Sequence, residues 1–196
     1  MNTHKTITKS ILPLLLVMGL VGVTQAQDIT NTMTGTAQLV DNITIDPGEG
    51  DDASVDFGQV LTNVTSSIFL DPKEANNTNV SGDASIGVFK VGGSPGTSVT
   101  IGYTAVVAMT GETVGNTYGL SWQPALSYNQ DNPALPGNSL SLTQGQNLNL
   151  NSNDLHLYIG GNLFETGGDT FTPFANNGAP TPDTYSGDVT ITVTIN

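Results

Sequence analysis

The C-terminal segment of the chain alternates strictly between aliphatic and threonine residues. Its aliphatic positions are Val189, Ile191, Val193 and Ile195, and the positions between them are Thr190, Thr192 and Thr194. Because successive side chains of a β-strand point to opposite faces of a sheet, this pattern buries one face and leaves hydroxyl groups on the other. The C-terminus is therefore predicted to be a half-buried strand.

The same alternation recurs in shorter form along the chain. It is clear at 98–103, with Val99, Ile101 and Tyr103 on one face, and at 155–159, where His156 and Tyr158 are expected on the polar face. Weaker patterns predict strands at 53–61, 64–70, 86–91 and 139–142.

No part of the sequence keeps an apolar period of 3.6 residues with a cap at each end, so little helix is expected. The 23 glycines and 10 prolines supply turn signals between the short strands. The sequence therefore predicts an all-β fold, an immunoglobulin-like β-sandwich of about seven to nine antiparallel strands. A closed β-barrel is the alternative that fits the same pattern.

The first 26 residues have the pattern of an export signal. Lys5 and Lys9 precede an apolar run at 11–23, and the small residues Thr24 and Ala26 follow it. The run is shorter than the roughly 20 apolar residues that span a bilayer. We expect cleavage after Ala26, no membrane span, and export to the periplasm, the cell surface or the exterior.

The chain that remains after cleavage is strongly acidic. Its only basic residues are Lys73 and Lys90, and two lysines against 17 acidic residues give a formal charge of −15. Nucleic acids and anionic lipids are therefore not expected as partners, because both are bound mainly through Lys and Arg. With His156 as its one histidine and no cysteine, this chain is predicted to be neither an enzyme nor a cofactor-binding protein.

An arm at 27–38 is predicted to precede a single domain at 39–196. From residue 29 on, the odd positions other than Asn31 carry apolar or small residues, and the pattern runs on to Leu39 just beyond the arm: Ile29, Met33, Gly35, Ala37 and Leu39. Such a one-sided strand can add itself to the sheet of a neighbouring subunit. Alternatively, it is the first strand of its own sandwich, since sequential strands commonly pair.

Four acidic residues gather in a segment, 46–52, that contains Pro47 and is expected to be a loop: Asp46, Glu49, Asp51 and Asp52. Calcium binds closely spaced carboxylates on flexible loops, so a calcium site is one hypothesis. A solvated acidic loop is the other.

Three aromatic residues lie within one mostly polar stretch: Tyr118, Trp122 and Tyr128. If exposed, they would form a platform on which sugar rings stack. The alternative is that Trp122 fills the core, because sandwiches commonly bury one large aromatic residue.

Three motifs carry a resemblance to a known family. They are V-D-F-G at 55–58, G-V-F-K-V-G-G-S-P-G at 87–96, and the ending Y-S-G-D-V-T-I-T-V-T-I-N at 185–196. With these motifs the chain resembles a family of secreted bacterial proteins described only as a domain of unknown function. The ending is also similar to that of spore-coat-like and chaperone–usher pilin subunits, in which such a strand closes the sheet. The resemblance implies an exported sandwich and membership of a surface assembly.

Two functions are consistent with these features. The first is a structural subunit or accessory of a cell-surface filament or matrix that self-associates through its terminal strands. The second is a monomeric, adhesin-like module that binds glycans or surfaces through loops around Trp122 and at 165–184.

Overall fold

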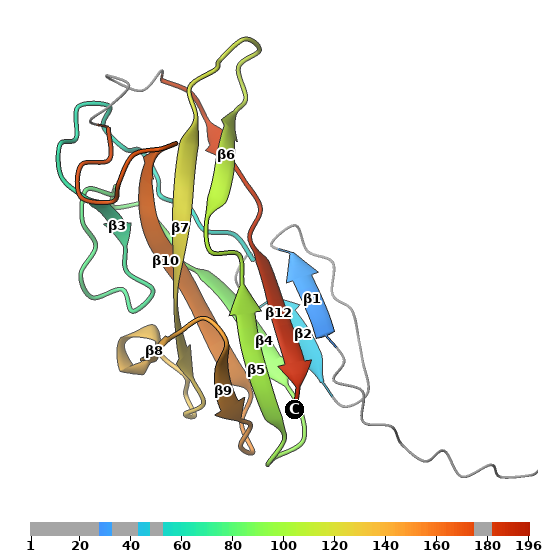
Figure 1. Ribbon diagram of the computed structural model, residues 1–196. Coiled ribbons are helices and arrows are strands. Elements are labelled where there is room, and N and C mark those ends of the chain that lie inside the picture. Colours follow the sequence, from blue (N-terminus) through green and yellow to red (C-terminus); the bar gives the residue numbers. More distant parts are fainter. Residues whose placement is uncertain (1–27, 33–42, 48–52, 175–181) are drawn as a thin grey trace, which may run out of the picture.

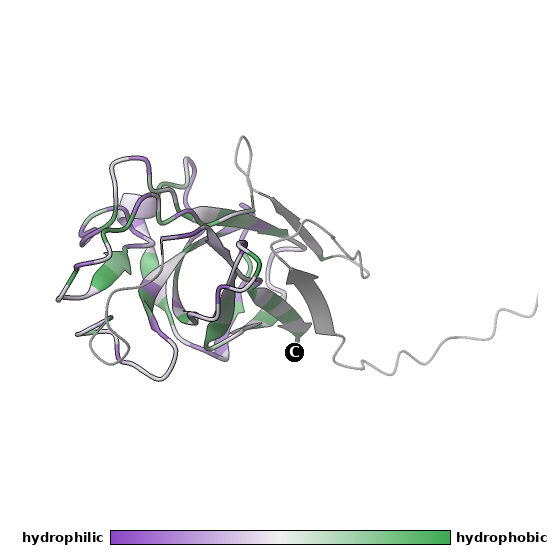
Figure 2. Cartoon of the chain, turned by 90° about the horizontal axis from the view of Figure 1, so that it is seen from above, coloured by the Kyte–Doolittle hydropathy of each residue, from purple (hydrophilic) through white to green (hydrophobic). Residues whose placement is uncertain are grey.

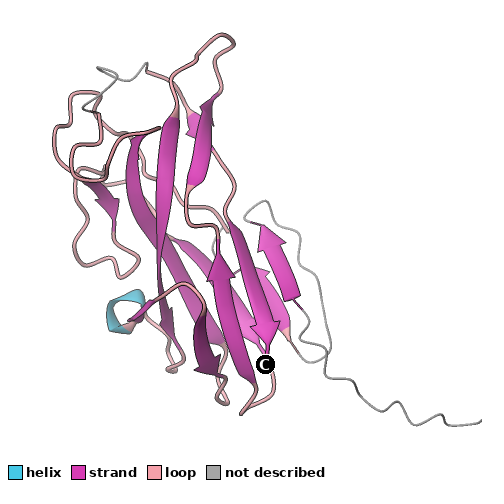
Figure 3. Cartoon of the chain, viewed as in Figure 1, coloured by secondary structure: helices cyan, strands magenta, loops and turns pink. Residues whose placement is uncertain are grey.

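The computed structural model describes residues 28–32, 43–47, 53–174 and 182–196 (Figure 1). In these residues strands predominate, and the one helical element is a short 3-10 turn, η1 (Figure 3). The elements are β1 (Asp28–Thr32), β2 (Thr44–Pro47), β3 (Ile68–Leu70), β4 (Gly87–Gly92), β5 (Ser98–Tyr103), β6 (Val107–Gly111), β7 (Leu120–Asn129), η1 (Pro136–Asn138), β8 (Leu140–Leu142), β9 (Gln146–Asn149), β10 (Leu155–Glu165), β11 (Tyr185–Ser186) and β12 (Thr190–Ile195).

The strands form two antiparallel sheets. The smaller sheet has the order β1-β12-β5-β9, and the larger has the order β11-β6-β7-β10-β4-β2, with β3 beside β10 and β8 beside β7. Seen from above, the strands carry hydrophobic stretches, whereas hydrophilic residues are frequent in the loops (Figure 2). The prediction of an all-β sandwich is confirmed.

The twelve strands exceed the expected seven to nine because some neighbours are divided into short pieces. β4 pairs with residues 155–159 of β10, and β3 pairs with residues 161–163. In the same way, β6 and β8 pair with successive stretches of β7. Several strands are therefore only three or four residues long, and so short a segment shows too little alternation to be predicted as a strand of its own.

The core lies between the two sheets and follows the predicted alternation. Val189, Ile191 and Val193 are fully buried, as are Val99 and Ile101 on the adjacent strand. Burying each such side chain contributes about 1.5–3 kcal/mol. The smaller sheet therefore has the apolar inner face that the sequence predicted.

Strand β7 was not among the predicted strands, although it forms the longest pairing in the molecule. It pairs with β10 over ten residues, from Asn129 opposite His156 to Leu120 opposite Glu165. Pro124 stands in the middle of β7, and proline inside a central strand normally argues against a strand. Its partner in the pairing is Gly161, which has a φ of +136°.

The outer face of the larger sheet is covered, which corrects the expectation that Tyr158 lies on an open polar face. Tyr158 is 3% exposed, and Ser127 opposite it is fully buried. The Ser127 hydroxyl donates to the Pro72 carbonyl oxygen at 3.3 Å and accepts a hydrogen bond from the Ser139 hydroxyl at 2.7 Å. Loops far apart in the sequence thus pack over this face.

Three predicted segment boundaries were wrong. Residues 53–61 form only an isolated bridge between Asp56 and Ser85, because the Asp56 carboxylate accepts from the Gly58 N–H at 2.6 Å and turns the chain. Within 64–70 only Ile68–Leu70 is a strand. Of the loop expected at 46–52, Asp46 and Pro47 belong to β2, and residues 48–52 lie outside the described residues.

Candidate functional site

The N-terminal strand β1 lies at the open edge of the smaller sheet, beside the C-terminal strand β12 (Figure 1). Five residues pair in an antiparallel register, from Asp28 opposite Thr194 to Thr32 opposite Thr190. Ile29 lies opposite Val193, whose side chain is fully buried. In this structure the N-terminal strand therefore pairs within its own chain.

The arm is not the single long strand that its alternation predicted. β1 belongs to the smaller sheet, whereas β2 pairs with β4 at the edge of the larger one. The remaining predicted arm residues, Met33, Gly35, Ala37 and Leu39, lie outside the described residues.

Strand β12 has a buried inner face, and among the described residues one of its edges pairs with β1 alone. On its other side it pairs with β5, where Ile191 lies opposite Tyr103 and Ile195 opposite Val99. Ile195, the last of the four predicted aliphatic residues, is only partly buried. β12 thus offers a preformed edge for an antiparallel strand.

Trp122 corrects the hypothesis of a glycan platform. Its side chain is 3% exposed, its indole N–H donates to the Gly160 carbonyl oxygen at 3.0 Å, and its ring contacts Phe57 edge to face at 6.1 Å between centroids. A buried indole has no free face on which a sugar can stack. The alternative, that Trp122 belongs to the core, is confirmed.

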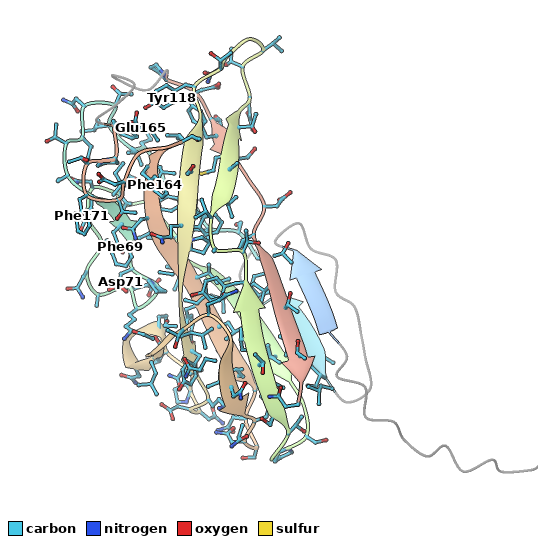
Figure 4. The ribbon with its side chains drawn as sticks, in the orientation of Figure 1. Phe69, Asp71, Tyr118, Phe164, Glu165 and Phe171 are labelled. Atoms are coloured by element: carbon cyan, nitrogen blue, oxygen red, sulfur yellow. The ribbon has the colours of Figure 1, made fainter. Side chains whose placement is uncertain are left out.

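Tyr118 and Tyr128 lie at opposite ends of β7 and do not form one surface. Tyr118 donates its hydroxyl to the fully buried Glu165 carboxylate at 3.1 Å (Figure 4). Burial, followed by this hydrogen bond and the charge of Glu165, raises the pKa of Tyr118 to about 12. At the other end, the Tyr128 hydroxyl accepts a long hydrogen bond from the Gln146 amide at 3.5 Å.

The proposed calcium ligands are only partly described. Asp46 lies in β2 opposite Lys90, and Glu49, Asp51 and Asp52 fall outside the described residues. Within residues 28–32, 43–47, 53–174 and 182–196, no group of three or more potential ligand side chains is placed to hold a metal ion. The calcium hypothesis stays a prediction.

A cleft of about 690 Å³ lies on the outer face of the larger sheet. Its floor is formed by Val88 and Lys90 of β4 and by His156 and Tyr158 of β10. The rest of its lining comes from four segments outside these two strands: Glu74, then Ser85 and Ile86 before β4, then Asp131, Asn132, Ala134 and Pro136 after β7, and the segment 152–154 before β10.

The charges in this cleft are unevenly compensated. Lys90 Nζ lies 2.9 Å from Asp154 Oδ2, and the backbone oxygen of Asp154 lies 3.3 Å from His156 Nδ1. Glu74 and Asp131 are exposed, and their carboxylates have no hydrogen bond or ion pair with any described residue. The cleft therefore holds three carboxylates against one lysine.

Tyr158 lines the cleft, and its hydroxyl has no hydrogen-bond partner in the described part of the chain. Burial and the nearby Glu74 charge together raise the pKa of Tyr158. The sequence does not predict this site, because its residues come from distant segments and because the alternation at 155–159 places His156 on a polar face. The presence of His156 and Tyr158 on one strand face was the only available signal.

Together, the fold and these surfaces define an all-β sandwich protein with an edge strand at its N-terminus and a polar cleft on one face. Comparisons of the chain with protein-family models, with curated proteins and with solved structures found no match. Among the described residues, no helix has the length and apolarity needed to cross a membrane.

Proposed function

We propose that this chain is an exported, non-enzymatic structural protein, a subunit or accessory of a bacterial cell-surface filament or matrix. Its subunits associate when the N-terminal strand of one copy pairs with the C-terminal strand of another. The observation that carries this proposal is the position of β1, an edge strand that pairs with β12 over five residues.

The geometry supports exchange of β1 between copies, because the contacts between β1 and β12 can form within one chain or between two chains. When identical elements are exchanged between copies, each backbone hydrogen bond of the closed form is remade in the assembly, so the cost is low. Conversely, withdrawal of β1 leaves the edge of β12 unpaired, and an open edge is a template for another strand. A strand from a second copy satisfies that edge.

The sequence supports the other parts of the proposal. The pattern of residues 1–26 favours export, and the chain beyond it has one histidine and no cysteine for nucleophilic catalysis. Its large negative charge disfavours nonspecific association. Specific strand pairing is therefore the favoured route to assembly.

Light scattering on the mature chain, 27–196, and on a chain that lacks 27–38 tests the proposal. We expect oligomers of the mature chain and a folded monomer after the deletion. Substitution Ile29→Lys, opposite the buried Val193, should also reduce the mass, whereas Thr30→Lys, opposite Thr192, is the matched control. A monomeric mature chain would contradict the proposal.

A second candidate function is a monomeric, adhesin-like binding module. The outer-face cleft favours it, because concave sites lined by a few polar groups are where ligands bind. The two functions predict different results: a binding module remains monomeric with and without its N-terminal strand, and its ligand affinity is independent of protein concentration.

A further inference from the structure

We propose that the outer-face cleft binds an organic ammonium group carried on an apolar stem, as in an alkylamine or a lysine side chain. This inference goes beyond strand exchange and does not depend on it, since the cleft lies on the larger sheet and β1 belongs to the smaller one.

The first argument is charge. Asp154 is already paired with Lys90 at 2.9 Å, so the unmatched carboxylates in the cleft are those of Glu74 and Asp131. They belong to loops separated in the sequence, and both line the same hollow. Carboxylates without a partner attract a cationic ligand and repel an anionic one, and the net charge of the whole chain reinforces this preference.

The second argument is the Tyr158 hydroxyl. Tyr158 lines the cleft and is 97% buried, and yet its hydroxyl group has no hydrogen-bond partner in the described part of the chain. Buried polar groups in native proteins nearly always have a partner, so an unpaired one needs an explanation. A ligand ammonium group explains it, because the N–H donates and the phenol oxygen accepts.

The third argument is the apolar part of the lining. Ile86, Val88, Ala134 and Pro136 line the cleft alongside the polar groups. An aliphatic stem buries its methylene groups against such residues while its charged end stays near the carboxylates, as lysine side chains do on protein surfaces. Apolar side chains do not bind a metal ion, and the described residues include no group of side chains that could coordinate one.

Calorimetric titration of the mature chain at low ionic strength, with n-butylamine as the probe, tests the proposal. n-Butanol is the neutral counterpart. We expect measurable binding of the amine that weakens as salt is added, and no binding of the alcohol. Nα-acetyl-lysine methylamide and its norleucine analogue form a parallel pair that distinguishes a free amine from a peptide side chain as the source.

Variants locate the site. Glu74→Gln and Asp131→Asn should each weaken amine binding about threefold to tenfold, and the double variant should abolish it. Glu112→Gln and Asp83→Asn remove the same charges from exposed positions outside the cleft lining and should retain the affinity. Tyr158→Phe should weaken binding about fivefold without lowering the thermal midpoint, because no protein partner of the hydroxyl is lost.

Binding of either ammonium probe with these losses supports the proposal, and the probe that binds more tightly identifies the source. Absence of binding for both amines, equal binding of the neutral counterparts, or unchanged affinity in the double variant would overturn it. These binding results do not depend on the oligomeric state, so this proposal can fail or succeed independently of the proposal of strand exchange.

Discussion

The indole N–H of Trp122 donates to the backbone carbonyl oxygen of Gly160 across the β7–β10 pair, at 3.0 Å. The indole comes close because two successive glycines occupy β10 at this point. A Cβ on Gly161 would clash with the Gln123 carbonyl oxygen and lie 2.8 Å from the indole nitrogen. The lack of side chains at these two glycines thus leaves the space that the indole of Trp122 occupies.

Trp122→Phe should destabilise the fold by about 2–4 kcal/mol. The substitution leaves the Gly160 carbonyl without its donor and opens a cavity beside Phe57. Urea denaturation followed by far-ultraviolet circular dichroism measures the change. Val114→Ala, at a fully exposed position, is the control and should have little effect. Equal stability of Trp122→Phe and the native chain would show that the indole is not part of the core.

Gly161→Ala should destabilise the fold by at least about 2 kcal/mol, because alanine is strained at a φ of +136° and its Cβ meets the β7 backbone. The matched control is Gly82→Ala, where a Cβ meets nothing within 4 Å. That substitution should change the free energy of unfolding by no more than about 0.5 kcal/mol. Similar values for the two variants would contradict the described backbone of β10.

Alternation in the sequence predicted the strands whose one face is buried by the opposite sheet. At β12 and β5 the buried set agrees with the aliphatic positions, because this burial depends only on the local period of two. Strand β7 was not predicted, because Pro124 argues against a central strand and because polar residues such as Ser121 and Ser127 are buried in it as well.

The cleft could not be predicted by the same means. Tyr158 was expected to face solvent, and it is covered because distant loops fold over the outer face of the sheet. Asp131 is 57 residues from Glu74 and 23 residues from Asp154 along the chain. No local sequence pattern predicts that these three residues line one cleft. Loop packing of this kind depends on the whole fold.

Asp183 makes stability depend on acid pH. The Asn116 side-chain amide first, and then the Thr113 N–H and hydroxyl, lower the pKa of the Asp183 carboxyl below its ordinary value of 3.8. A carboxyl whose pKa is lower in the folded state stabilises that state above the ordinary pKa, and this contribution is lost as pH falls through the folded-state value. Hence the thermal midpoint should be lower at about pH 3 than at neutral pH.

Asp183→Asn is expected to lower the thermal midpoint at neutral pH and to reduce its fall in acid. Asp83→Asn, which changes the charge equally, serves as the control and should keep the acid dependence of the native chain. Circular dichroism melts at neutral and acid pH make the comparison. An unaltered pH profile in Asp183→Asn would contradict the hydrogen bonds assigned to this carboxylate.

The most direct test of strand exchange uses the absence of cysteine from the chain. One population carries Ile29→Cys and a second carries Val193→Cys, two positions that lie opposite each other in the β1–β12 register. After the two populations are mixed and oxidised, the account predicts a disulfide-linked heterodimer. A mixture of Asn31→Cys with Val193→Cys, two residues out of register, should give little of it. If the cross-link forms only when Ile29→Cys and Val193→Cys are in the same chain, β1 belongs to its own subunit alone and the account is wrong.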